Sequence, residues 1–288
     1  MTLFTIFGGN GFIGRHLASA LRSADLPVST PQRGTAPESL GPMGHIVYCA
    51  GVTADFRNRP YDTMDAHVGL LSQILAAGTF DSLLYLSSTR LYDGASHGSE
   101  ETTFTVDPWS PNDLYNISKL SGETLCLNHD CPQVRVARLS NVYGTGMYSG
   151  DQGLQNFLCS VIFDAVTKQH VQLQTAPGSS KDYIHIGDVV RALAMIAIDG
   201  TDRIYNVASA VNVSHEQLLD RLSELTGCTW STAPDAPQVG FPAISTGRIS
   251  AAFAAAGLRW EPTAMLDRLP DLTRAALGST HITEGAFG

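Results

Sequence analysis

The chain has 288 residues, of which 43% are hydrophobic and 16% charged, which is typical of a globular protein with a large core. Its net charge of -9 argues against nucleic acid or an anionic membrane as the main partner. No apolar run approaches a bilayer span, and the first residues lack the basic region of a signal peptide. We therefore expect a soluble, cytoplasmic protein with no membrane partner and no nucleic-acid partner.

Strand-like and helix-like segments alternate along the first half of the chain. Short apolar runs predict strands, and segments with apolar residues three or four positions apart predict helices. This alternation predicts an α/β fold with a parallel sheet covered by helices on both faces. In chain order, we expect a strand at 3–7, a helix through Ile13, Leu17 and Leu21, strands at 28–30 and 46–50, a helix at 64–77, a strand at 83–87, a helix at 114–127 and a strand at 134–139.

A glycine-rich turn, GGNGFIG at 8–14, lies between the first strand and the first helix. It fits both GxxGxxG and GxGxxG, which in this strand–turn–helix context are typical of dinucleotide binding. Glycines let the backbone approach a pyrophosphate, and the helix N-terminus offers N–H groups and the positive end of its dipole. The alternative is a turn that serves packing alone. The residues expected to hold the dinucleotide here are Gly8, Gly11, Phe12, Ile13 and Gly14.

The end of the second strand, TPQRG at 30–34, contains no acidic residue. NAD-binding units of this type usually place an Asp or Glu there to bind the ribose hydroxyl. Arg33 is instead suited to the 2′-phosphate of NADP. We therefore predict NADP as the cofactor, with NAD possible, and an arginine exposed on a turn is the alternative interpretation of Arg33.

The predicted helix at 114–127 carries a tyrosine and a lysine at i and i+4. Tyr115 and Lys119 therefore lie side by side on one helix face. A neighbouring ammonium favours the phenolate and lowers the pKa of the phenol, which suits an acid/base catalyst. The alternative is an ordinary exposed Tyr/Lys pair beside a core-facing stripe.

Several motifs occur in the order typical of one family. They are GGNGFIG (8–14), SSTRLY (87–92), YNISK (115–119), RLSNVYG (138–144), KDYIHIGDVV (181–190), YNVAS (205–209) and GLRWEP (257–262). Together they resemble the extended short-chain dehydrogenase/reductase family, the NAD-dependent epimerases, dehydratases and reductases of nucleotide sugars. The resemblance implies an α/β fold with a doubly wound parallel sheet of the Rossmann type and a smaller C-terminal substrate-binding lobe. We expect an NAD(P)-binding Rossmann domain at 1–165 and the lobe mainly at 166–288, with 182–207 returning to the first domain.

The resemblance also implies roles for single residues. Tyr115 matches the acid/base, Lys119 its pKa-lowering partner and ribose ligand, and Ser88 the hydroxyl that polarises the reacting C–O group. A metal site is not expected, because the five cysteines lack metal-binding spacing. The further residues expected at the site are Ala50 and Gly51 for the cofactor, and Thr89, Arg90, Asn141 and Lys181 for the substrate, with Lys181 in the place of an arginine that binds diphosphate.

Two departures from the family pattern bear on function. Only residues 34–45 separate the second strand from the strand at 46–50, so the strand that normally frames the adenine is missing. Thr89 and Arg90 stand where dehydratases carry the Asp-Glu pair that eliminates water, which argues against a 4,6-dehydratase.

These features favour NADPH-dependent reduction of a keto-sugar carried on a nucleotide. An NAD-dependent nucleotide-sugar epimerase needs the same Ser, Tyr and Lys and is the alternative. A non-catalytic NADP-binding redox sensor is a weaker alternative, because such proteins tend to lose the Tyr/Lys pair. A non-sugar carbonyl substrate also stays open. By resemblance we expect a homodimer formed through the helices at 64–77 and 114–127.

Overall fold

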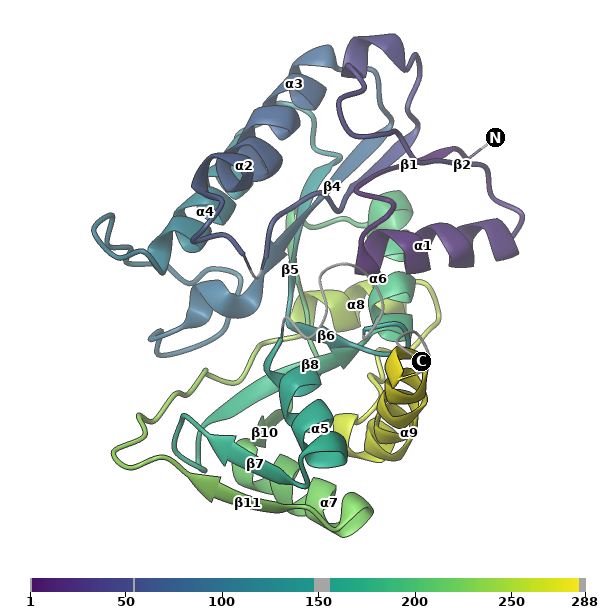
Figure 1. Ribbon diagram of the computed structural model, residues 1–288. Helices are drawn as coiled ribbons and strands as arrows, with labels where there is room; N and C mark the ends of the chain where they lie inside the picture. Colours follow the sequence, from purple (N-terminus) through teal and green to yellow (C-terminus); the bar gives the residue numbers. More distant parts are fainter. Residues whose placement is uncertain (1, 54, 148–155, 285–288) are drawn as a thin grey trace.

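The structure is a computed structural model that describes residues 2–53, 55–147 and 156–284, and the side chains of these residues as far as 278. A six-stranded parallel sheet with its helices forms the upper part, and smaller sheets with further helices form the lower part (Figure 1). In the described part of the chain, no helix combines the length and the apolar character needed to cross a bilayer.

The large sheet has the strand order β2-β1-β3-β4-β5-β9, and every neighbouring pair is parallel. The chain reverses its direction of strand addition between β1 and β3, which creates the crevice where open α/β sheets bind ligands. This is the predicted doubly wound Rossmann sheet. Its strands are β1 (Phe4–Phe7), β2 (Val28–Ser29), β3 (His45–Tyr48), β4 (Ser82–Ser88), β5 (Val134–Leu139) and β9 (Ile204–Val207).

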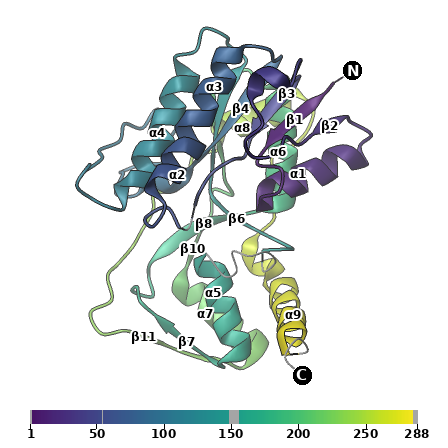
Figure 2. The same cartoon turned by 45° about the horizontal axis from the view of Figure 1, so that its top comes forward.

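Helices cover both faces of the large sheet (Figure 2). Strand β4 shows why, since its side chains alternate between the faces. Leu83 and Tyr85 belong to the core under α3 (Leu70–Ala77) and α4 (Asp113–Leu127), as do side chains of α3. Leu84 and Leu86 belong to the opposite core, with side chains of α1 (Phe12–Ser23) and α6 (Ile186–Asp199). A strand buried on both sides therefore appears in the sequence as one continuous apolar run.

The helix predicted at 64–77 is built in three pieces. It begins as α2 (Pro60–Met64), continues through a π-helical turn at Asp65–Gly69, and ends as α3. π-Helical turns occur frequently at functional sites. Here the turn carries the fully buried His67.

The predicted absence of a strand before β3 is confirmed. Between β2 and β3 the chain forms only a short 3₁₀ helix, Pro37–Ser39, and loops. Strand β2 therefore forms the edge of the sheet. It has only two residues, and both are half-buried. The side of the sheet expected to frame the adenine therefore ends in its shortest strand.

The lower part has its own hydrophobic core. Helix α8 (Gly247–Ala255) packs against β9 and α6, so the chain contacts the upper part again after the lower part has begun. The domain limits at 165 and 182–207 stay a prediction. The elements of the lower part are a sheet of β10 (Asn212–Ser214), β8 (Ser180–His185) and β6 (Asn141–Tyr143), a sheet of β11 (Thr229–Thr232) and β7 (His170–Leu173), and the helices α5 (Phe157–Thr167), α7 (His215–Thr226) and α9 (Met265–Glu284).

Candidate active site

The glycine-rich turn folds tightly onto the end of β3. Gly8 has φ +82°, and a Cβ on it would lie 2.6 Å from the backbone N of Ala50. A Cβ on Gly14 would lie 2.3 Å from the carbonyl oxygen of Gly8. Helix α1 then begins without a side-chain cap, so its first N–H groups remain available to an anion. Only glycine fits this cradle, and the cradle suits a dinucleotide pyrophosphate.

Arg33 lies in the loop that follows the edge strand β2. Its side chain is 81% exposed, and its Nη2 atom is 3.8 Å from Oδ1 of Asp62. A pair this exposed contributes little to stability, because solvent screens it. The guanidinium is therefore accessible to a ligand phosphate, although Asp62 shares part of its charge.

Ser88 and Tyr115 meet at the carboxyl edge of the sheet. Ser88 ends β4, and its Oγ accepts a hydrogen bond from the backbone N–H of Arg90 at 3.2 Å. Tyr115, in the first turn of α4, is 6% exposed, and its hydroxyl lies close enough to Ser88 for that side chain to affect its pKa. Burial raises the pKa of Tyr115, and the Ser88 hydroxyl and the charge of Arg90 oppose this rise.

Lys119 lies one turn further along α4 and is also buried. Its Nζ donates a hydrogen bond to the carbonyl oxygen of Leu86 at 2.8 Å and lies 5.8 Å from the Tyr115 ring centroid. Burial lowers the pKa of Lys119 to about 7, although the Glu123 carboxylate opposes this effect. The structure therefore brings Ser88, Tyr115 and Lys119 together, and Lys119 titrates near neutral pH.

Two residues that contact Tyr115 were not found from the sequence. The Phe56 ring packs against it at 5.5 Å between centroids, and the His67 ring meets it edge-on at the same distance. Nδ1 of His67 lies 2.8 Å from Oγ of Ser118, and burial lowers the pKa of His67 to about 2. A single Phe or His in a loop or a helix gives no sequence signal, so only the packing reveals them.

A buried polar network ties the Ser88 turn to the Lys119 helix. Glu123 and Arg138 form an ion pair at 2.7 Å with side chains 3% and 4% exposed. Arg138 donates to the Tyr92 hydroxyl at 2.8 Å, and this hydroxyl donates to Oδ1 of Asn206 at 2.8 Å. Tyr92 lies in the 3₁₀ turn Thr89–Tyr92 that follows Ser88. The network therefore joins that turn to α4, β5 and β9.

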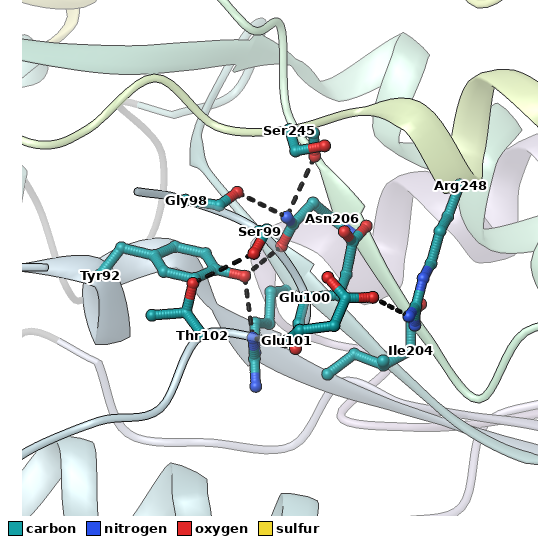
Figure 3. A network of polar contacts seen from close by, with 11 residues as sticks. Tyr92, Gly98, Ser99, Glu100, Glu101, Thr102, Ile204, Asn206, Ser245 and Arg248 are labelled. Carbon is teal, nitrogen blue, oxygen red and sulfur yellow. Dashed lines mark hydrogen bonds and ion pairs between the residues drawn. The ribbon is translucent and has the colours of Figure 1, made fainter. Parts of the chain in front are cut away.

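Figure 3 shows how Asn206 connects this network to Gly98 and Ser245. Its side-chain nitrogen donates to the carbonyl oxygens of Gly98 and Ser245, at 3.1 and 3.0 Å. Its backbone N–H donates to Oε1 of Glu100 at 3.0 Å. Tyr92, Arg138 and Asn206 lie within three of the family motifs, which is the signal that could have identified them.

The residues expected to bind the substrate are spread over both parts. Thr89 is buried, and Arg90 is half-buried with its Cζ atom 5.5 Å from the Tyr115 ring centroid. Asn141 is exposed, and its Nδ2 donates to the carbonyl oxygen of Asp182 at 2.8 Å. Lys181 is half-buried, with its Nζ 5.2 Å from the Phe157 ring centroid, and both burial and the charge of Arg90 lower its pKa. Arg90 and Lys181 thus lie in one electrostatic neighbourhood.

The model of the NAD dependent epimerase/dehydratase family matches residues 4–208. This chain belongs to that family. The curated relatives that it matches include enzymes named for reactions of nucleotide sugars. The GDP-6-deoxy-D-mannose reductase of Pseudomonas aeruginosa is 26% identical over 247 residues, which cover 76% of this chain and 79% of the reductase. The dTDP-glucose 4,6-dehydratase of Streptomyces griseus is 29% identical over 156 residues, which cover 52% of this chain but under half, 45%, of the dehydratase.

Solved structures share the fold of this family member over nearly its whole length. MoeE5 in complex with UDP-glucose and NAD is 21% identical with a TM-score of 0.77, and the match covers 97% of this chain and 100% of MoeE5. RMD from Pseudomonas aeruginosa complexed with NADPH is 22% identical with a TM-score of 0.76, and the coverage is again 97% and 100%. The predicted family and the predicted Rossmann fold are both confirmed.

Proposed function

We propose that this chain reduces a keto group on a nucleotide-linked sugar with NADPH. The observation that carries the proposal is that Ser88 and Lys119 both lie near Tyr115, and that a glycine cradle suited to a dinucleotide lies near the same site. The bound dinucleotide supplies the hydride. Ser88 and Tyr115 hydrogen-bond the keto oxygen, and Tyr115 donates the proton that this oxygen needs. Lys119 stabilises the phenolate that Tyr115 becomes and binds the ribose.

The proposed preference for NADPH rests on the edge of the sheet. No acidic residue follows β2 in the stretch 30–34, and Arg33 extends into solvent there. An arginine pairs well with the 2′-phosphate that distinguishes NADPH from NADH. Asp62 competes with a 2′-phosphate for the Arg33 guanidinium, and this contact keeps NAD-dependent epimerisation as the second candidate.

We also propose that the chain does not carry out 4,6-dehydration. Thr89 and Arg90 occupy the turn directly after Ser88, and neither side chain is a carboxylic acid. A guanidinium stays protonated and cannot abstract a carbon-bound proton. The turn therefore lacks the acid/base pair that elimination of water requires, although a dehydratase is among the relatives.

A screen of nucleotide sugars and their keto forms with NADPH and NADH, followed at 340 nm, tests the proposal. We expect oxidation of NADPH with at least one keto-sugar, and loss of turnover by about 10²–10⁴-fold in Tyr115→Phe with NADPH binding retained. Full activity of Tyr115→Phe contradicts the role of Tyr115 as the proton donor. Turnover with tightly retained NAD and no added hydride donor points to the epimerase instead.

We further propose a cytoplasmic homodimer formed through the outer faces of α3 and α4. Shallow apolar grooves lie on this surface, lined by partly buried side chains that include Ile117, Leu120 and Leu125. A pair of such helices buries these side chains against the same surface of a second copy. Light scattering during size-exclusion chromatography tests this, with Leu125→Glu expected to give the monomer.

A further inference from the structure

Arg90 lies against the centre of the site rather than at its rim. Its Cζ atom is 5.5 Å from the Tyr115 ring centroid and 5.2 Å from that of Phe56. Its backbone N–H is bonded to Oγ of Ser88. The Arg90 side chain is therefore placed by the same turn that places the proposed catalytic serine, and a ligand group bound to it lies beside the atoms that Ser88 and Tyr115 contact.

The Arg90 guanidinium is not neutralised by the protein. Within residues 2–53, 55–147 and 156–278, no carboxylate forms an ion pair with it and its side chain donates no hydrogen bond. Asp93 and Asp113 act on it only through longer-range electrostatics. Burial nevertheless lowers the pKa of Arg90, so the cation has lost part of its hydration. A partly desolvated guanidinium with five donors favours an anionic partner.

Neighbouring cations increase the positive potential around Arg90. Arg57 lies on the same Phe56 ring at 4.5 Å and disfavours the charge of Arg90. Arg57 is itself bonded to Oδ1 of Asn112, so its guanidinium already has a partner. Lys181 lies in β8, and the charge of Arg90 contributes to lowering its pKa. An anion that binds here is expected to pair with Arg90. The Arg57 guanidinium is already bonded to Asn112, and Lys181 belongs to β8 of the lower part.

The position of Arg90 decides which anion this is. In a nucleotide sugar the diphosphate is joined to C1, and the sugar ring separates it from a carbon such as C4. A carboxylate at C6 is instead separated from C4 only by C5. Since Arg90 contacts the ring of the proposed proton donor, its anion has to lie next to the reacting carbon.

Resting on the proposed function, we propose that Arg90 binds a carboxylate of the sugar itself, so that the substrate is a nucleotide-linked uronic acid. The planar guanidinium pairs with a carboxylate through two parallel hydrogen bonds, which a neutral hydroxymethyl group cannot form. Lys181 is then left for the diphosphate. Arg90 is thereby a specificity-determining residue for the ring substituent.

Binding of matched sugar pairs to the protein saturated with NADP⁺ tests the proposal by calorimetry. Each pair consists of the hexuronic acid and the hexose on the same nucleotide, in the UDP, dTDP and GDP series. In at least one series we expect the uronic acid to bind about 10-fold to 100-fold more tightly, the range of hydrogen bonds to charged groups. Arg90→Gln should abolish this preference, and Arg90→Lys should retain part of it.

Arg57→Gln is the matched control. It removes an arginine that packs on the same Phe56 ring, but the guanidinium of this arginine is already bonded to Asn112. It should leave the preference within about twofold. Unchanged NADPH binding by Arg90→Gln and Arg90→Lys verifies that both variants are folded. The proposal is overturned if no series shows a preference for the uronic acid, which includes the case in which neither sugar binds. It is also overturned if Arg90→Gln lowers the affinity for both sugars equally.

The failure of this proposal is distinguishable from failure of the proposed function. Reduction of a neutral keto-sugar with NADPH, lost in Tyr115→Phe and equally affected for both sugars by Arg90→Gln, supports the function and overturns the carboxylate site. A uronic-acid preference that depends on Arg90, without hydride transfer to any nucleotide sugar, supports the site and overturns the function.

Discussion

The two ends of the candidate site, one at β4 and α4 and the other at β2, differ in how deeply their side chains are buried and how fully they are bonded. At the β4–α4 end, Ser88, Tyr115 and Lys119 are held by burial and hydrogen bonds, with the Glu123–Arg138 pair beside them. At the β2 end, Arg33 is 81% exposed next to a two-residue edge strand. The chemistry is thus set by many mutually dependent contacts, whereas the choice of cofactor depends on one solvated side chain. Substitutions at the β4–α4 end should therefore destabilise the protein or abolish its activity. Substitutions at the β2 end should change the cofactor preference with little loss of stability.

The largest effect should come from the buried ion pair at the β4–α4 end. Glu123→Gln leaves the Arg138 charge buried without its partner, which should destabilise the protein by about 3–5 kcal/mol in chemical denaturation. Glu101→Gln is the control, since Glu101 pairs with Arg248 but is 65% exposed, and it should cost less than about 1 kcal/mol. Similar losses in both variants contradict the role of burial in the strength of the Glu123–Arg138 pair.

The paired serines at the end of β4 test which hydroxyl is catalytic. Ser88→Ala should lower kcat/KM by about 10²–10³-fold, the range for one donor to a developing oxyanion. Ser87→Ala removes a buried hydroxyl with no hydrogen-bond partner in the described structure and should change kcat/KM by less than about twofold. Steady-state kinetics on a substrate found in the nucleotide-sugar screen decides between them.

The glycine cradle connects the two ends. Gly14→Ala places a Cβ 2.3 Å from the Gly8 carbonyl oxygen, a backbone atom that cannot move aside freely. We expect a loss of about 1–3 kcal/mol in the free energy of unfolding, as for other overpacked positions. Gly240→Ala, where a Cβ meets no atom within 4 Å, should be close to neutral. Thermal unfolding without cofactor measures this separately from NADPH binding.

At the β2 end, one substitution should alter cofactor preference without harming the fold. Arg33→Gln should weaken NADPH binding about tenfold by removing a charge-assisted bond to the 2′-phosphate, and leave NADH binding unchanged. Asp62→Asn should strengthen NADPH binding slightly, because it frees Arg33 from its ion pair. Dissociation constants from fluorescence titration measure both, and equal effects on NADPH and NADH rule out a phosphate contact.

The last expected effect is a pH dependence of stability caused by Lys119. Its folded pKa of about 7 lies below the unfolded pKa of about 10.4, so the unfolded state binds more protons between these values. Burying the ammonium therefore opposes folding below pH 7, and this opposition is relieved as the pH rises from about 7 toward 10.4. The stability of the native protein should rise over this window relative to Lys119→Met, measured by denaturation at several pH values.

Much of the fold and part of the site follow from local patterns in the sequence. The βα alternation and the glycine turn depend on neighbouring residues, so they could be predicted directly. The missing strand before β3 was predictable from the short spacing at 34–45 together with the family resemblance. Tyr115 and Lys119 were predictable as neighbours because helix geometry fixes the distance between i and i+4. The strand at 83–87 was predictable as an apolar run, although its alternation between two cores was not visible in it.

The sequence by itself determined the sheet, the cradle and the proposed acid/base helix, because each is encoded over a few consecutive residues. Only the tertiary structure decided that Glu123 faces Arg138, that His67 lies against Tyr115, and that Arg90 meets Tyr115 with no acidic partner in the described chain. These contacts join segments far apart in the chain, and strand order decides which of them meet. A charged residue looks the same in sequence whether it is solvated, paired or poised for a ligand, and its burial and neighbours alone distinguish these cases.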